Sequence, residues 1–422
     1  MSSPIAPARA GRTTAEIRPA VTVLSGFWPE ATAAVTDALL ASRPALLCVE
    51  HDLTGMAAGA VRRVVRTGAE VLEDVTVELV HGCVSCTLRE DVLPTLVRLA
   101  ATHPDHDQLL VLPRSIEPET LQAACAYCLV DGAPVADSVR FDSYLTVVHG
   151  RRLLDDLTST DDLADRGLQA ADDDHRAVAD LVAHQIESAD TLALFWHTAD
   201  EDFDRVRLSV LLHRLAPWAT QHQVTGGAPG RLPAVGHTHR YDPETPGILA
   251  RGIEGHLVGV HEPVPDCGLV SVVFRARRPF HPRRLDAALR GLTVPTLRSR
   301  GHLWLASQPD TVVAWEGAGG GLGLGSLGRW LAAVPDEDWS EASDQRRVTA
   351  AAGWDPYYGD RDTHLVFIGI GLDAATVHRT LVGCLLTDAE LSLGESRWRT
   401  FDDPFAGCFA DDEAPDPPGA AQ

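Results

Sequence analysis

The stretch VTVLSGFWPEATAAVTDALL (residues 21–40) decides how the N-terminal part of the chain is expected to fold. It runs from β-branched residues through Ser25 and Gly26 into an apolar pattern with helical spacing. This strand, turn and helix is the form of a phosphate-binding loop, whose consensus is G-x-x-x-x-G-K-S/T. The form indicates an α/β arrangement, and the stretch is either a ruined nucleotide site or a strand, turn and helix that only resembles one.

The residues of this loop do not match the consensus. Ala31, Thr32 and Ala33 stand where it has Gly, Lys and Ser/Thr, and the chain contains no lysine, so that all 36 of its basic residues are arginine. The lysine of a phosphate loop acts as a compact charge, for which a planar guanidinium is not an equivalent. We therefore predict that Ser25, Gly26, Ala31, Thr32 and Ala33 form a degenerate phosphate loop.

Length and composition limit the classes of protein to consider. A chain of 422 residues that is 45% hydrophobic is long enough for two domains. Its net charge of -23 would repel nucleic acid and anionic membranes, so neither is an expected partner. The sequence shows no apolar run of about 18 residues and no signal core, which favours a cytoplasmic protein.

Strand-like and helical patterns alternate through the first half of the chain. The strand-like runs lie at 20–25, 45–50, 75–80, 108–112, 143–148 and 190–196. Such alternation predicts three layers, with a mostly parallel sheet between helices. After a segment rich in Gly, Pro and His, the pattern restarts as a smaller α+β domain.

These patterns predict five regions. They are a disordered leader at 1–18, a degenerate nucleotide-binding domain at 19–217, a linker at 218–268, an α+β domain at 269–405 and a disordered acidic tail at 406–422.

The decapeptide HGCVSCTLRE carries the strongest chemical signal, because Cys83 and Cys86 have C-x-x-C spacing. Thr87 and Glu90 fit a capping box that would open a helix over 88–100. Cys86 would then lie beside the positive end of that helix, where the thiolate is favoured.

Ligands of an open parallel sheet gather at the carboxyl ends of its strands. Glu50, His51 and Asp52 follow one predicted strand, and His81 follows another, just before the cysteines. Two thiolates with a histidine or a carboxylate would make a tetrahedral zinc site. On spacing alone, a thiol redox pair and two unligated structural cysteines are alternatives.

Together these segments resemble the CobW-like family of metal-handling P-loop GTPases, relatives of UreG and HypB, over roughly residues 20–405. In the first domain the similarity rests on VTVLSGF, GCVSCTLREDVLPTLVRLA and HQIESADTLAL. In the second it rests on RSRGHLWLASQPD, VFIGIGLD and WRTFDDPF. The resemblance implies GTP-driven insertion or trafficking of a metal, commonly zinc or cobalt.

The nucleotide motifs that this resemblance implies are altered. Pro29 removes a backbone donor, and Glu30 places a negative charge where phosphates would lie. The family's Glu-Thr-Ser-Gly-like segment and its guanine-reading Asn-Lys-x-Asp correspond here to LPRS (112–115) and FWHT (195–198). The family's Cys-x-Cys-Cys keeps its outer thiols and has Ser85 at the third position.

We therefore expect a CobW-like protein of metal homeostasis that binds zinc or a client protein and has lost GTP hydrolysis. One alternative is a GTP-dependent zinc metallochaperone with a rearranged site, in which Arg89 or Arg114 replaces the lysine. The other is a protein-interaction scaffold that binds no metal. Zinc, rather than GTP with magnesium, is the expected bound species, and a client that receives or donates the metal is the expected partner.

Overall fold

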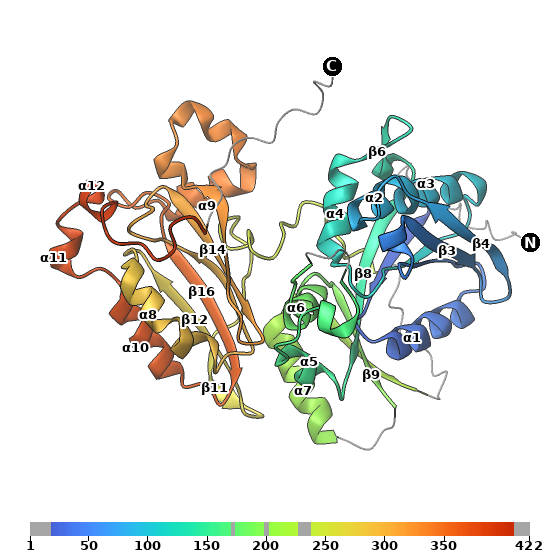
Figure 1. Cartoon of the computed structure of the whole chain (residues 1–422), viewed down its shortest axis with the longest axis horizontal. Helices are drawn as coiled ribbons and strands as arrows, with labels where there is room; N and C mark the ends of the chain where they lie inside the picture. The colour runs from blue at the N-terminus through green and yellow to red at the C-terminus, as the bar shows by residue number, and fades with distance from the viewer. Residues whose placement is uncertain (1–17, 170–173, 198–201, 227–237, 409–422) are drawn as a thin grey trace, which may run out of the picture.

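The chain forms two domains that lie side by side, each with its own sheet (Figure 1). The computed structural model describes residues 18–169, 174–197, 202–226 and 238–408. Almost all of the predicted leader and most of the predicted acidic tail lie outside these residues.

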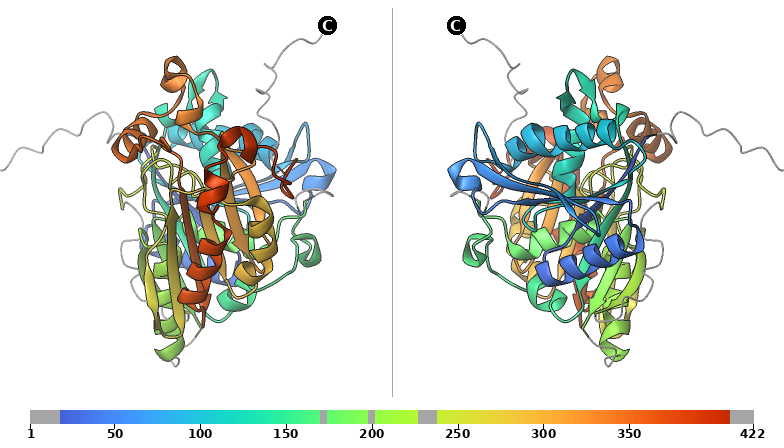
Figure 2. Two further views of the ribbon diagram at one scale, coloured as in Figure 1. Left: turned by 90° about the vertical axis from the view of Figure 1, so that its left-hand side faces the viewer. Right: turned by 90° about the vertical axis from the view of Figure 1, so that its right-hand side faces the viewer.

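Eight strands make up the N-terminal sheet, in the order β10-β9-β8-β1-β5-β2-β3-β4. The six parallel strands are β1 (Ala20–Ser25), β2 (Leu47–Asp52), β5 (Gln108–Val111), β8 (Arg140–His149), β9 (Thr191–Trp196) and β10 (Thr220–Thr225). An antiparallel edge follows, formed by β3 (Ala60–Arg66) and β4 (Val71–Glu78), and it projects from the domain in Figure 2. The prediction of a mostly parallel sheet is confirmed.

Helices cover both faces of this sheet and complete the three layers. One face packs against α1 (Pro29–Ser42), α5 (Leu153–Leu157), α6 (Val178–Glu187) and α7 (Asp202–Leu215). The other packs against α3 (Leu93–Thr102) and α4 (Pro118–Tyr127), with the short α2 (Val84–Thr87) ahead of α3 and the hairpin β6 (Leu129–Val130) and β7 (Ala133–Pro134) after α4. Strand β1 divides its side chains between the two cores, since Leu24 lies in the first and Val21 and Val23 lie in the second.

Two strands differ from the prediction. β3 was not predicted, and it turns the run expected at 75–80 into the outer strand of an antiparallel edge. β10 lies inside the predicted linker 218–268, where it pairs with β9. The connecting segment therefore begins after Thr225 and ends at β11 (Glu262–Asp266).

The C-terminal domain is an antiparallel sheet of six strands in the order β11-β12-β16-β13-β14-β15. After β11 these are β12 (Leu269–Ala276), β13 (Arg298–Leu303), β14 (Thr311–Ala318), β15 (Gly323–Arg329) and β16 (Thr363–Ile370). The helices are α8 (Pro282–Thr293), α9 (Asp344–Gly353), α10 (Ala374–Cys384), α11 (Asp388–Leu391) and α12 (Glu395–Trp398). Because α8 and α10 pack on the face turned away from the N-terminal domain, the predicted α+β domain is confirmed (Figures 1 and 2).

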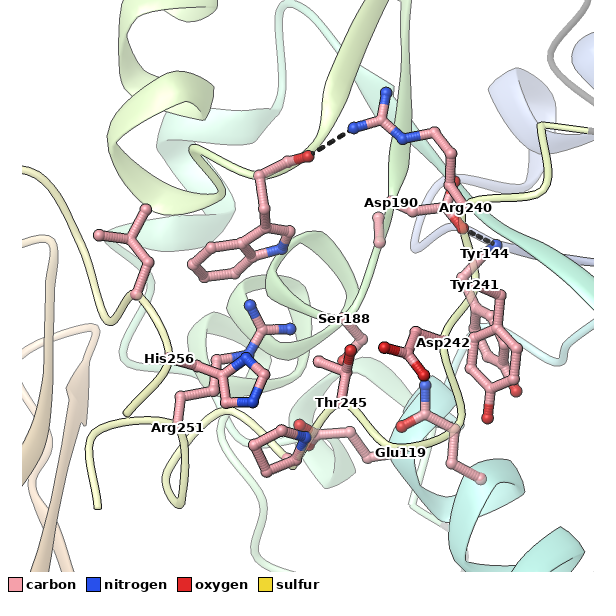
Figure 3. A pocket seen from close by; sticks show the side chains of 16 residues that line it. Glu119, Tyr144, Ser188, Asp190, Arg240, Tyr241, Asp242, Thr245, Arg251 and His256 are labelled. Atoms are coloured by element: carbon pink, nitrogen blue, oxygen red, sulfur yellow. Dashed lines mark hydrogen bonds between the residues drawn. The ribbon is translucent and has the colours of Figure 1, made fainter. Parts of the chain in front are cut away.

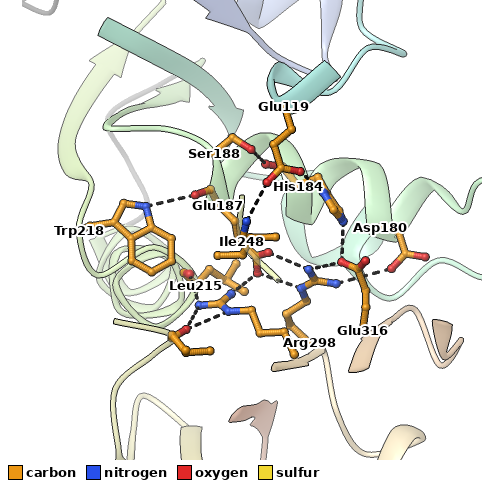
Figure 4. Close-up of polar contacts among 12 residues, drawn as sticks. Glu119, Asp180, His184, Glu187, Ser188, Leu215, Trp218, Ile248, Arg298 and Glu316 are labelled. Carbon is orange, nitrogen blue, oxygen red and sulfur yellow. Dashed lines mark hydrogen bonds and ion pairs between the residues drawn. The ribbon is translucent and has the colours of Figure 1, made fainter. Parts of the chain in front are cut away.

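The inner face of this sheet packs against α6 and α7 of the N-terminal domain. The apolar core of the N-terminal domain continues into it through Val258, Leu269 and Val366. In the middle of the joint, Glu187 is fully buried and accepts two hydrogen bonds from Arg298, of 2.9 and 2.7 Å (Figure 4). The buried Arg300 contacts the same carboxylate, so the two domains share an ion network.

A polar cavity of about 230 Å³ lies beside this joint, between α4 and the connecting segment (Figure 3). Its charged groups are engaged with the protein. The Arg240 guanidinium donates to the Trp218 carbonyl, that of Arg251 lies 3.8 Å from the centre of the Trp218 ring, and Asp190 accepts from the Tyr144 amide. The cavity therefore belongs to the packing of the joint.

None of the helices in the described part of the chain has both the length and the apolar run that crossing a bilayer demands.

Candidate functional site

A cavity of about 640 Å³ opens at the carboxyl ends of β1, β2 and β5. Gly26, Thr32 and Ala33 of the altered loop form one wall, and the segment from Glu50 to Asp52 forms another. The altered loop and the segment from Glu50 to Asp52 thus meet at this edge of the sheet, and His81, which was expected to join them, is not among the residues that line the cavity. Their meeting follows from the parallel order of the strands.

The altered loop is a tight turn. Only residues 26–28 separate β1 from α1, which begins at Pro29. Both the amide and the hydroxyl of Thr32 donate to the Trp28 carbonyl, at 3.0 Å each. A Cβ atom on Gly26 would lie 2.5 Å from the Thr32 hydroxyl, so the turn packs directly on the helix. Thr32 stands at the position of the lysine of a phosphate loop. Its amide is thus engaged in a hydrogen bond at the start of α1.

The charges around the cavity do not favour an anion. Its charged side chains include the carboxylates of Glu50 and Asp52 and one guanidinium, that of Arg114. Hydrogen bonds from Thr54 hold the pKa of Asp52 below its usual value, so this group stays ionised. Burial lowers the pKa of Arg114. A triphosphate would therefore meet one guanidinium, the Asp52 carboxylate and the Glu50 carboxylate, which is already paired with Arg66.

Cys83 and Cys86 lie at the start of α2. Cys83 is the N-cap residue, and its sulfur accepts a hydrogen bond from the Cys86 amide at 3.1 Å. The Thr87 hydroxyl donates to the Cys83 carbonyl. The capping box predicted for Thr87 and Glu90 is therefore wrong, because the helix already begins after Cys83. A π-helical turn over 88–92 follows, a feature that is frequent at functional sites.

The ionisation of Cys86 also differs from the prediction. The pKa of its thiol is raised, first by a hydrogen bond to Cys83 and then by burial. The thiol is therefore the stable form without metal, although the sulfur lies in the first turn of a helix. This shift is opposite to the one that was expected for a thiol beside the start of a helix.

His51, a predicted ligand, is oriented by a carboxylate. Its side chain is buried, and its Nε2 atom lies 2.7 Å from Asp91 Oδ2. Its Nδ1 atom has no hydrogen-bond partner among the described residues. A carboxylate that holds one ring nitrogen is the usual second-shell arrangement of a metal-bound histidine. The His51 ring is thus oriented in the way that is usual for a metal-bound histidine.

The other predicted ligands are engaged or exposed. Glu50 accepts a hydrogen bond from Arg66 at 2.8 Å, and Asp52 accepts from Thr54. His81 is exposed and precedes the cysteines.

The turn at Met56–Ala58 separates the cysteine segment from the cavity. Gly82 packs so closely on the Met56 carbonyl that a Cβ atom there would lie 2.0 Å from its oxygen. In residues 18–169, 174–197, 202–226 and 238–408, no group has both thiols and a third donor atom all within 4.8 Å of one another. The structure thus brings Cys83 and Cys86 together, while their further ligands stay a prediction.

One group of three donors was not predicted. Ligand atoms of Glu30, His149 and His197 lie within 4.8 Å of one another. His149 ends β8 and His197 directly follows β9, and these adjacent parallel strands end at the same edge of the sheet. The signal was therefore present as a histidine at the end of each strand, but it required the strand order to be seen.

Two family models match this chain. The CobW/HypB/UreG nucleotide-binding domain matches residues 48–200, and the cobalamin synthesis protein cobW C-terminal domain matches residues 269–385. The zinc chaperone Rv0106 of Mycobacterium tuberculosis is 34% identical over 397 residues, which cover 92% of this chain and 93% of that protein. The chain belongs to the CobW family. The resemblance found in the sequence is confirmed.

One further relative and one solved structure are also similar to this chain. Zinc-regulated GTPase metalloprotein activator 1 of Dictyostelium discoideum is 31% identical over 357 residues, covering 81% of this chain and 73% of that protein. The crystal structure of Zn(II)-bound YjiA GTPase from E. coli aligns with 87% of this chain and 99% of that chain, at 14% identity and a TM-score of 0.35.

Proposed function

We propose that this CobW-family protein handles zinc in the cytoplasm without hydrolysing GTP. In this proposal it binds the ion at Cys83 and Cys86 and exchanges it with a client protein. The observation that carries the loss of hydrolysis is the tight turn from β1 to α1, in which the helix begins too early to leave a phosphate cradle. The match to the nucleotide-binding domain begins at residue 48, after this turn, which supports the same conclusion.

Zinc is the proposed metal because two relatives carry it in their names, the zinc chaperone and the zinc-regulated GTPase metalloprotein activator. Thiolates also suit zinc better than they suit magnesium or calcium. Cys83 and Cys86 supply two ligands, and His81 on the same loop is the nearest candidate in sequence for a third. A site with few protein ligands leaves positions open to a client, as exchange of the ion requires.

Replacing Cys83 and Cys86 by alanine is expected to remove one equivalent of zinc per chain. The measurement is an anaerobic titration in competition with a chromophoric chelator. Because zinc must displace the proton of Cys86, the affinity of the wild-type site should rise with pH. Cys408→Ala, which removes an exposed thiol far from the pair, is the matched control and should leave the zinc content unchanged.

Two results would contradict the cysteine site. If the double variant binds as much zinc as the wild type, the cysteines are not ligands. If neither protein binds zinc while client binding persists, the scaffold without metal is the correct function.

GTP with magnesium is expected to give no binding heat in calorimetry and no phosphate release above background. The main competing possibility is a rearranged GTPase that uses Arg114, since this residue lines the cavity. Arg89 does not line that cavity and instead pairs with Glu90. Magnesium-dependent turnover that is lost in Arg114→Ala would establish the competing function and overturn ours.

A further inference from the structure

We propose that Glu30, His149 and His197 form a second metal site, one that takes a tetrahedral divalent ion of the zinc class. The three side chains come from three elements. Glu30 lies in the first turn of α1, His149 ends β8, and His197 directly follows β9. The proposal is independent of the cysteine pair, because none of these residues belongs to that segment.

The distances between the donor atoms fit a tetrahedron. His149 Nε2 lies 3.4 Å from His197 Nε2 and 3.4 Å from Glu30 Oε1, and His197 Nε2 lies 3.8 Å from the same oxygen. Zinc bonds of about 2.0 to 2.1 Å place tetrahedral ligand atoms about 3.3 Å apart. The same bonds in an octahedron would place neighbouring ligand atoms only about 2.9 Å apart. Two of the three separations thus already match a tetrahedral ion.

The central histidine is held in place. The side chain of His149 is only 3% exposed, and its ring meets those of Phe195 and Trp28 edge-on or tilted, at 5.9 and 6.4 Å. Glu30 and His197 are about half exposed, at 48% and 54%. One ligand is therefore rigid, two can adjust, and the fourth position is left to water or to a ligand atom from another molecule.

The hydrogen bonds of His149 determine which of its ring nitrogens faces the site. Without metal, Nδ1 accepts from the Arg151 amide at 3.2 Å, which leaves the ring proton on Nε2, facing Glu30. A metal bound at Nε2 would require the ring proton on Nδ1, so the Arg151 amide would have to give up this hydrogen bond.

The chemistry of the donors selects the ion. Two imidazoles and one carboxylate suit zinc and its transition-metal neighbours, whereas magnesium and calcium prefer oxygen ligands alone. A competing cation is also present, because an Arg152 nitrogen lies 3.6 Å from the Glu30 oxygen. The ion must displace this guanidinium, so removing it should tighten metal binding.

The test is a zinc titration of the double variant Cys83→Ala and Cys86→Ala. We expect this protein to keep one equivalent of zinc. Adding His197→Ala or Glu30→Gln should weaken the remaining site by at least about a hundredfold, more than the loss of an outer-shell partner costs. Both side chains are half exposed, so neither change removes core packing. His378→Ala, an exposed histidine in the other domain, is the matched control and should leave the affinity unchanged.

Arg152→Gln in the same background should bind zinc several-fold more tightly. An unchanged or weaker affinity would contradict an ion beside Glu30. The proposal is overturned if the double variant binds no zinc, or if its zinc persists unchanged after His197→Ala and Glu30→Gln. If instead the cysteine pair fails as a site, the wild type and the double variant will hold equal zinc, and the histidine variant will still lose it.

Discussion

Glu187→Ala is expected to lower the free energy of unfolding by about 3 to 5 kcal/mol, the usual effect of removing one partner from a buried ion pair. The reason is that Arg298 and Arg300 are both fully buried and would lose their shared carboxylate. Among the described residues, Arg300 would keep its hydrogen bonds to the carbonyls of Val258 and Leu215 and its position 5.5 Å from the centre of the Trp218 ring, but no carboxylate within ion-pair distance. An uncompensated guanidinium in a core is far more costly than the bond that is lost.

Denaturant unfolding measures this effect, with Asp402→Ala as the control. Asp402 pairs with Arg283 on the surface, where both side chains are more than 60% exposed, and such a pair contributes at most about 1 kcal/mol. Because α6 carries Glu187 and β13 carries both arginines, the variant should also unfold its two domains less cooperatively. Equal stabilities of the two variants would show that the joint does not depend on this carboxylate.

The stability of the wild type is expected to fall by roughly 4 kcal/mol more than that of His184→Gln between pH 7 and pH 10. Burial by itself lowers the pKa of His184, but its hydrogen bonds to Glu119 and Glu316 outweigh this and raise the pKa to about 10. In the unfolded chain the value is about 6.5. The folded protein therefore holds the proton more tightly, and this stabilisation is fully present below pH 6.5.

As the pH rises toward 10, the unfolded chain has already released the proton and the folded protein must follow, so the stabilisation disappears. The measurement is the free energy of unfolding of both proteins at several pH values. His378→Gln, which changes an exposed histidine, should follow the pH dependence of the wild type. The interpretation fails if the wild type and His184→Gln lose stability in parallel.

Several of the strands that the sequence predicted contain a long apolar run. β1, β8 and β9 are buried on both faces, so their apolar residues are nearly continuous. β3 (AVRRVVR) was missed because paired arginines interrupt its apolar residues. β10 (TQHQVT) was missed because a half-exposed strand at the edge of a sheet needs few apolar residues. Such strands form because they pair with neighbouring strands of the sheet. The pattern of apolar residues within one short segment carries no information about that pairing.

The candidate sites could be predicted only where their residues lie close together in the sequence. The spacing of Cys83 and Cys86 indicated a metal-binding pair, and the structure does bring the two residues together. It did not indicate that the turn at Met56 would separate them from the cavity. His149 and His197 lie about 50 positions apart, and they meet only because β8 and β9 are neighbours in the sheet.

The early start of α1 bears on how this branch of the CobW family could evolve. Restoring Gly, Lys and Thr at residues 31–33 would place them in the first turns of a formed helix, with the amide of residue 32 still bonded to Trp28. A working loop would also require that turn to unwind and Gly26 to separate from the helix. No single substitution is thus a step back toward nucleotide binding. Under the proposed function, selection for nucleotide binding would no longer constrain these positions, and a side chain such as Glu30 could serve the second metal site.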